Sequence, residues 1–177
     1  MVKAKDAIST ARKLIGTPYS ELDCIALIRE IIKKTSGGYA SYRCEGTNWL
    51  WRSIGNSGKY RHLTWRQENI SGARPGMLTF KANGDDIHHV GLVTDNGTVI
   101  HSSSVYGKVI ETTLDSSWHY LGQHRYIEVA DTVVELPEDL PECSEPVGEP
   151  GAKGVTTLIR DDGTIISMVG DWRVAED

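Results

Sequence analysis

Two stretches near the start of the chain have apolar residues at helical spacing. In residues 3–15 an apolar side chain recurs at every third or fourth position, and Gly16 ends the pattern. In residues 24–34 the isoleucines share one side, and Asp23 stands where a helix N-cap is expected. Gly37 and Gly38 then stop the pattern. Two amphipathic helices are therefore predicted.

From Pro75 onward the pattern changes to short runs rich in β-branched residues, which are typical of strands. Helices followed by strands indicate an α+β domain, with N-terminal helices packed on an antiparallel sheet. A short helix at 48–54 is expected between the two parts. The strands are predicted at 77–81, 88–94, 98–102, 108–112 and 125–129.

The composition changes near residue 131. Between Glu135 and Pro150 lie four of the six prolines and six acidic residues, which is typical of a linker. Residues 155–160 and 164–169 then flank Asp161-Asp162-Gly163, a strong hairpin signal. We expect a domain at 1–130 and an extension at 131–177. Because a lone hairpin is marginal in water, it should dock on the main domain or pair with a second copy as a homodimer.

Charge and hydropathy exclude some classes of protein. The formal net charge is −5 and no basic stripe is present, which argues against a nucleic-acid partner. No run approaches the roughly 18 apolar residues of a membrane helix. The N-terminus has no signal-peptide core or cleavage site, so synthesis and retention in the cytoplasm are expected unless another factor releases the protein. Nothing calls for a metal or an organic cofactor.

Cys24 is the cysteine best placed for chemistry. It falls in the first turn of its predicted helix, where free N–H groups and the helix dipole favour a thiolate nucleophile. The alternative is a buried core cysteine. Cys44 and Cys143 have no such setting, and three sparse cysteines do not form a disulfide framework or a zinc site.

A nucleophilic cysteine needs a histidine within reach and a third group to orient it. Residues 95–97 (Asp-Asn-Gly) fit a three-residue hairpin loop, which would pair Gly91 with His101. His89 would then lie on the same sheet face as His101, on a diagonal, with Gly91 leaving room for the rings.

Other interpretations of the histidines stay open. A two-residue loop would place His89 and His101 on opposite faces, and the two could also be unrelated. His88 would point away if His89 points inward. Three more histidines lie in segments without comparable geometry: His62, His119 and His124.

Four segments carry a recognisable set of motifs: GTPY at 16–19, Asp23-Cys24 before a helix, PGMLTF at 75–80, and HVGLV at 89–93 followed by Asn96-Gly97 and His101. Together they resemble the NlpC-type family of cell-wall cysteine peptidases. The resemblance covers residues 3 to about 130.

The resemblance implies a papain-like fold and a peptidase that cuts the peptide stems of peptidoglycan, most often between D-glutamate and a diamino acid. Cys24 would attack the peptide carbonyl, His89 would act as its base, and His101 would hold the His89 ring. Tyr19 resembles the family's active-site tyrosine, although it could be a packing aromatic. Asp23 would help to receive the substrate, or only cap the helix.

The chain also departs from the family pattern. Ser20-Glu21-Leu22 stand where a tryptophan and two glycines are usual, Ile25-Ala26 replace a Ser-Gly pair, and Met77 replaces an aspartate. The exact substrate is therefore open. One alternative is an amidase or acyltransferase on the same fold, and another is a phage tail structural protein with a vestigial site. Short versions of this kind resemble phage or prophage enzymes such as endolysins, which a holin or injection device delivers to the wall.

Overall fold

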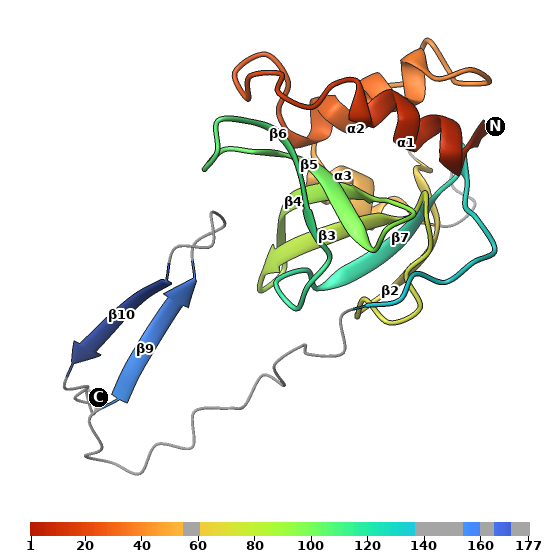
Figure 1. The fold of residues 1–177 in the computed structure, drawn as a ribbon. Coiled ribbons are helices and arrows are strands. Elements are labelled where there is room, and N and C mark those ends of the chain that lie inside the picture. The colour runs from red at the N-terminus through yellow and green to blue at the C-terminus, as the bar shows by residue number, and fades with distance from the viewer. Residues whose placement is uncertain (55–60, 137–153, 160–164, 171–177) are drawn as a thin grey trace. The chain divides into compact units, whose positions relative to one another are not determined.

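The computed structural model describes residues 1–54, 61–136, 154–159 and 165–170 (Figure 1). The chain divides into two compact units, Met1–Leu140 and Pro141–Asp177. The first unit continues past the boundary expected at residue 130. Val134 is buried, and its N–H donates to the carbonyl of Ala73 at 2.8 Å. Residues 131–136 therefore belong to the main unit by their packing.

The described residues form three helices, none of which is long and apolar enough to span a membrane. They are α1 (Ala4–Arg12), α2 (Cys24–Lys34) and α3 (Thr47–Arg52). The bounds of α2 match the prediction, and Asp23 caps it by accepting from the N–H of Ala26 at 2.7 Å. The expected helix 3–15 is too long, because its last residues form turns that end at Gly16, whose φ is 91°.

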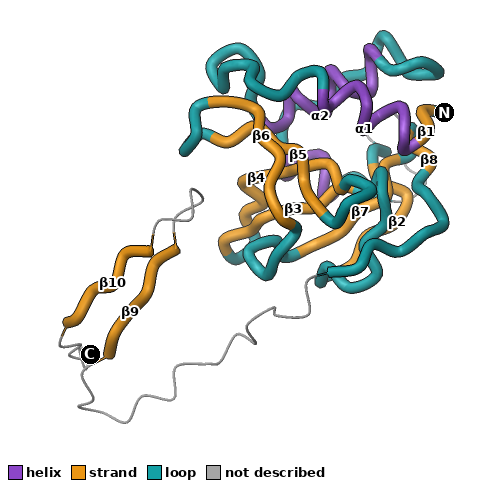
Figure 2. The backbone as a smooth tube through the Cα atoms, viewed as in Figure 1, coloured by secondary structure: helices purple, strands orange, loops and turns teal. Residues whose placement is uncertain are grey.

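One antiparallel sheet carries most of the strands. Its six strands run in the order β2-β7-β3-β4-β5-β6. Their bounds are β2 (Leu63–Gln67), β3 (Leu78–Asn83), β4 (Asp86–Val93), β5 (Thr98–Ser103), β6 (Lys108–Thr113) and β7 (Tyr120–His124). Two short strands, β1 (Val2–Lys3) and β8 (Ile127–Glu128), pair in parallel beside it (Figure 2). The α+β prediction is confirmed.

The sequence pattern missed one end of the sheet. Strands β2 and β7 were not expected, and the strand expected at 125–129 is wrong except for the two residues of β8. β7 lacks a clear alternation because Gly122 has no side chain. A Cβ there would lie 3.0 Å from the side chain of Leu63 and 3.2 Å from that of Phe80, so the glycine that weakens the pattern also avoids crowding in the core.

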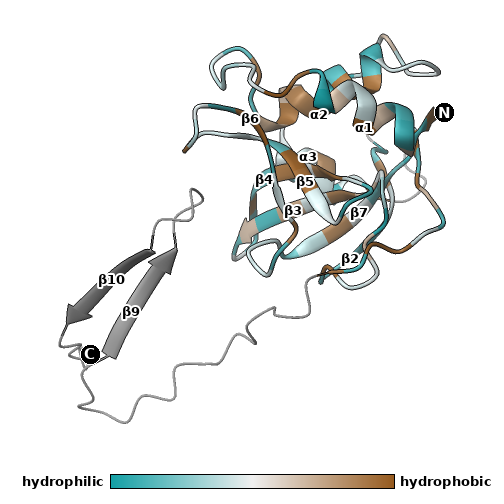
Figure 3. Cartoon of the chain, in the orientation of Figure 1, coloured by the Kyte–Doolittle hydropathy of each residue, from teal (hydrophilic) through white to brown (hydrophobic). Residues whose placement is uncertain are grey.

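Both faces of the sheet are covered. The buried residues of α2 form one cluster with Leu78, Phe80, Val90, Leu92 and Ile100. Figure 3 shows apolar (brown) stretches in α2 and in the central strands. The opposite face holds a second cluster that includes Met77, Val93, Val99, Trp118 and Leu121. Because side chains alternate along a strand, His89 shares a face with Val93, and His101 shares a face with Val99. Both histidines therefore belong to the face that carries Trp118.

The second unit contains the predicted hairpin. β9 (Gly154–Ile159) and β10 (Ile165–Gly170) pair antiparallel, with Ile165 opposite Ile159. The expected turn at Asp161–Gly163, Cys143 and most of the linker lie outside the described residues. Pairing of this hairpin with a second copy stays a prediction.

Candidate active site

The segment leading into α2 is tied to the far edge of the sheet. The N–H of Gly16 donates to the carbonyl of Val109 at 2.9 Å, and that of Tyr19 to Gly107 at 2.8 Å. The hydroxyl of Ser102 on β5 donates to the carbonyl of Leu22. The start of α2 is thus anchored to the strand that carries His101.

Cys24 lies in the first turn of α2 and is only 7% exposed. Burial raises the pKa of its thiol, and the charge of Asp23 adds to the rise. Backbone hydrogen bonds from Val90, Ile25 and Cys24 itself lower the pKa but do not reverse the shift. The thiolate expected from the helix position is therefore wrong for the resting protein, because burial outweighs the helix end. The backbone contact with Val90 places the thiol beside the residue that follows His89.

The histidine hairpin has the predicted register. Leu92 lies opposite Ile100 and Val93 opposite Val99, so Gly91 falls opposite His101. A Cβ on Gly91 would overlap the side chain of Val99 and crowd the Cβ of His101 at 3.2 Å, which explains why this position needs glycine. Nε2 of His89 is 2.8 Å from Nδ1 of His101, and the rings are nearly perpendicular at 88°. The predicted diagonal pair is confirmed.

The hydrogen-bond chain continues to a residue that the sequence did not reveal. Nε2 of His101 lies 3.2 Å from Oγ1 of Thr112 on β6. His101 pairs with Ile110, so Thr112 is its diagonal neighbour. Burial, followed by the charge of Lys81, lowers the pKa of His101 to about 4. His101 therefore stays neutral at physiological pH and can accept a hydrogen bond.

Trp118 covers the histidine pair. Its ring stacks on His89 with centroids 5.5 Å apart and meets His101 edge-on at 5.3 Å. The ammonium of Lys81 lies 4.8 Å from the Trp118 ring. Trp118 is buried, so it keeps water from the hydrogen bond between the two imidazoles and strengthens that bond. Sequence reasoning missed it because residues 114–119 match no strand pattern.

The two expected substrate residues lie on the segment that leads into Cys24. Burial raises the pKa of Tyr19, and the charges of Cys24 and Asp23 add to the rise. Tyr19 is half-buried. The carboxylate of Asp23 is engaged as the α2 cap.

The remaining histidines lie elsewhere. His88 is exposed, and His119 accepts from the N–H of Ala82 at 2.9 Å. The hydroxyl of Tyr42 bridges Nδ1 of His62 at 3.1 Å and Nε2 of His124 at 2.8 Å. Burial lowers the pKa of both histidines, that of His124 to about 3. This cluster of Tyr42, His62 and His124 was not expected from the sequence.

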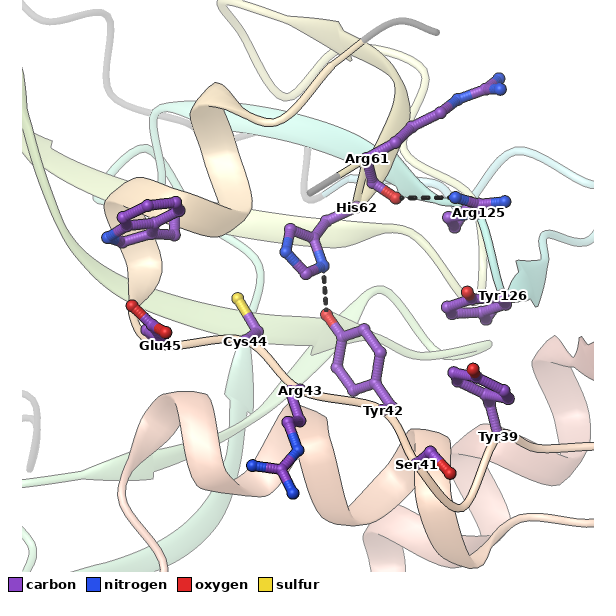
Figure 4. Close-up of a pocket in the computed structure, with 11 residues that line it drawn as sticks. Tyr39, Ser41, Tyr42, Arg43, Cys44, Glu45, Arg61, His62, Arg125 and Tyr126 are labelled. Carbon is purple, nitrogen blue, oxygen red and sulfur yellow. Dashed lines mark hydrogen bonds between the residues drawn. The ribbon is translucent and has the colours of Figure 1, made fainter. Parts of the chain in front are cut away.

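Cys44 follows Tyr42 by two residues and lines the same pocket as Tyr42 and His62 (Figure 4). Burial raises the pKa of the Cys44 thiol, which lies 3.5 Å from the carbonyl of Gly46. Over the described ranges, no group of three His, Cys, Asp or Glu side chains is arranged to hold a metal ion.

A helix that begins at a cysteine, packed on an antiparallel sheet with a buried histidine pair, is the architecture of papain-like cysteine hydrolases. The model of the NlpC/P60 family matches residues 13–130. The chain therefore belongs to the NlpC/P60 family, which comprises cell-wall hydrolases of the cysteine-peptidase type.

Solved structures of this family are similar at low identity. The NlpC/p60 domain of the peptidoglycan hydrolase SagA is 20% identical, over 69% of this chain and 99% of that one, with a TM-score of 0.48. RipB from Mycobacterium tuberculosis is 19% identical, over 71% and 65%, with a TM-score of 0.49. A family protein from Bacillus cereus is 18% identical, over 67% and 39%, with a TM-score of 0.48. No curated protein sequence matches the chain significantly.

Proposed function

We propose that the protein is a cysteine endopeptidase that hydrolyses peptidoglycan stem peptides, with Cys24 as nucleophile, His89 as base and His101 as the group that orients His89. The observation that carries the proposal is the 2.8 Å hydrogen bond between Nε2 of His89 and Nδ1 of His101. It gives the base a defined orientation on the strand whose next residue, Val90, contacts the Cys24 thiol.

We assign the protons so that every member of the hydrogen-bond chain is satisfied. In this assignment His101 donates from Nε2 to Thr112, so its Nδ1 carries no hydrogen and can accept one from His89. Nε2 of His89 is then the donor, and its Nδ1 is free of a proton and basic. His89 can therefore take the thiol proton through Nδ1, while His101 remains neutral.

The reaction would proceed by acyl transfer. As the thiol sulfur of Cys24 attacks the carbonyl carbon, its proton passes to His89, which then gives it to the leaving amine. Water then attacks the thioester, and His89 again acts as base. Because burial raises the pKa of Cys24, proton transfer should accompany attack rather than precede it. N–H groups in the first turn of α2 would stabilise the oxyanion.

The bond between D-glutamate and a diamino acid is the proposed cleavage site. Tyr19 would contact the stem peptide near the thiol. Asp23 would attract a free amino group of the peptide through its charge, although it already caps α2. Delivery to the wall by a phage-type release system is also part of the proposal.

The test is mass spectrometry of purified wall fragments incubated with the protein. Cys24→Ala is the inactive variant, and Cys44→Ala is a matched control because that thiol is also buried but is remote from the histidine pair. New stem-peptide ends made by the unmodified protein and by Cys44→Ala, but not by Cys24→Ala, would establish the peptidase and its bond. Release of intact stems from the glycan would instead identify an amidase. No cleavage of several wall chemistries would indicate an acyltransferase or a vestigial site.

A further inference from the structure

A cavity of about 400 Å³ lies away from the catalytic residues, and none of them lines it. Its walls come from residues 39–45 after α2, from Trp49 on α3, and from residues next to β2 and β7 (Figure 4). β7 is three strand spacings from β5, which carries His101, or about 14 Å across the sheet. The cavity is therefore a separate site, within the size range of small-ligand pockets.

Aromatic rings form the rim of this cavity. Tyr39 and Trp49 are each 48% exposed. Tyr39 stacks on Tyr126 with centroids 5.1 Å apart. Flat, half-exposed rings in polar surroundings suit a ligand with an apolar face and a polar edge, such as a sugar ring. A wholly apolar ligand would require deeper enclosure.

The floor of the cavity is rigid and neutral. Tyr42 is fixed between His62 and His124, and all three are buried. Figure 4 shows Tyr42 and His62 meeting there. These groups already satisfy one another, so ligand binding must draw on the rim.

The charge of the rim favours an anion. Arg43, Arg61 and Arg125 line the cavity, whereas Glu45 is the one carboxylate among its described lining residues. The guanidinium of Arg125 is held over the Tyr126 ring and donates to the carbonyl of Arg61. Nε of Arg61 is buried, and the described part of the chain supplies it with no hydrogen-bond acceptor. The planar guanidinium of arginine matches a carboxylate well.

We propose that this cavity binds a carboxylate-bearing saccharide, with the sugar ring against the rim aromatics and the carboxylate on Arg61 and Arg125. The wall origin of that saccharide rests on the proposed function. Glycan bound here would hold the polymer while its stem peptide reaches Cys24. The carboxylate can belong to the sugar or to the attached peptide.

The test measures binding by calorimetry to Cys24→Ala protein, which cannot cut the probes. Three probes distinguish a carboxylate on the sugar from one on the peptide. They are glycan strands stripped of stem peptides, disaccharides that keep their stem, and neutral chitotetraose. At least tenfold tighter binding is expected for one or both carboxylated probes than for chitotetraose. Arg61→Gln should weaken that binding about tenfold, and Trp49→Ala should weaken it about fivefold.

Matched controls lie outside the cavity. Arg74→Gln and Trp65→Ala remove the same residue types and should leave the affinity within twofold. Thermal unfolding checks each fold, and Arg125→Gln replaces Arg61→Gln if the latter does not fold. Equal affinity for chitotetraose, no binding of either carboxylated probe, or binding insensitive to the cavity variants would overturn the proposal. Cleavage of a soluble stem peptide by the unmodified protein tests the proposed function separately.

Discussion

The molecule contains two histidine pairs, His89–His101 (the first pair) and His62–His124 (the second pair). They are built from similar side chains but differ in arrangement. Each joins two imidazoles and a hydroxyl group and lies near a buried cysteine. In the first pair the hydroxyl of Thr112 stands at the end of the chain, beyond His101. In the second the hydroxyl of Tyr42 stands in the middle, so both histidines turn inward.

The difference in exposure follows from this order. His89 is half-buried, whereas His62 and His124 are buried at 5% and 1% exposure. In the proposed mechanism the half-buried His89 takes the proton, whereas Tyr42 bridges the two buried rings of His62 and His124. The order of the groups and the exposure of one ring, rather than residue type, would then distinguish the proposed catalytic pair from the structural one.

The largest effect is expected when one histidine of each pair is replaced by glutamine. His89→Gln should lower kcat/KM on a soluble stem peptide by about 10²–10⁴-fold, since it removes the base. His62→Gln should leave kcat/KM within a few-fold and lower the melting temperature instead. Steady-state kinetics with calorimetric unfolding measures both. Comparable loss of activity in the two variants would remove the distinction between the pairs.

Acid should destabilise the protein through both pairs. In the unfolded chain the histidines bind protons below pH about 6.5. In the folded protein His101 does so near pH 4 and His124 near pH 3. The unfolded chain therefore holds more protons between these values, and the free energy of unfolding falls as the pH falls from 6.5. The slope is roughly 1.4 kcal/mol per pH unit per histidine.

Urea unfolding at pH 7, 6 and 5 measures this slope. His124→Gln should reduce the slope by the contribution of one histidine. His119→Asn, at an exposed position, should leave the slope unchanged. A free energy of unfolding that stays constant from pH 7 to pH 5 would contradict the neutral, buried state of these rings.

Tyr42→Phe tests the closed bridge alone. It leaves one ring nitrogen of His62 and one of His124 buried without a partner, each at a cost of about 1–3 kcal/mol. We expect a loss of about 2–4 kcal/mol in the free energy of unfolding, with kcat/KM on a soluble peptide unchanged. Tyr39→Phe is the control, because its ring is half exposed, and it should cost under about 0.5 kcal/mol. A negligible effect of Tyr42→Phe would show that the bridge does not stabilise the fold.

The first pair could be predicted from the sequence because one short loop determines it. The three-residue loop at 95–97 fixes the register of β4 and β5, and this register places His89 and His101 on one face. The same diagonal rule relates His101 to Thr112. The loop between β5 and β6 has four residues, 104–107, and admits more than one register, so the sequence could not place Thr112.

The second pair depends on contacts between distant segments. Tyr42 and His124 are 82 residues apart, and β2 and β7 give weak strand patterns. β2 is mostly exposed, so few of its residues are apolar, and β7 contains Gly122.

The direction of the Cys24 pKa shift could not be predicted from the sequence either. Position in the first turn of α2 indicates a thiolate, but the depth of burial that opposes it is a property of the packed structure.

The smallest effect is expected at the anchor of the first pair. Thr112→Val keeps the β-branched shape and removes the acceptor for Nε2–H of His101. His101 would then move its hydrogen to Nδ1, where it would meet the N–H of His89. To avoid two opposed donors, His89 would shift its own hydrogen to Nδ1 and lose its basic nitrogen. We expect kcat to fall about tenfold, or about 1.4 kcal/mol, with KM unchanged.

Thr112→Ser restores the hydroxyl and should restore most of kcat. Imidazole ¹⁵N chemical shifts report the tautomers of His89 and His101 without any turnover. Thr112→Val should change them and Thr112→Ser should not, whereas a purely structural role would leave the tautomers unchanged. If Thr112→Val keeps both the tautomers and kcat, His89 is oriented by His101 alone, and the distinction between the pairs reduces to the exposure of His89.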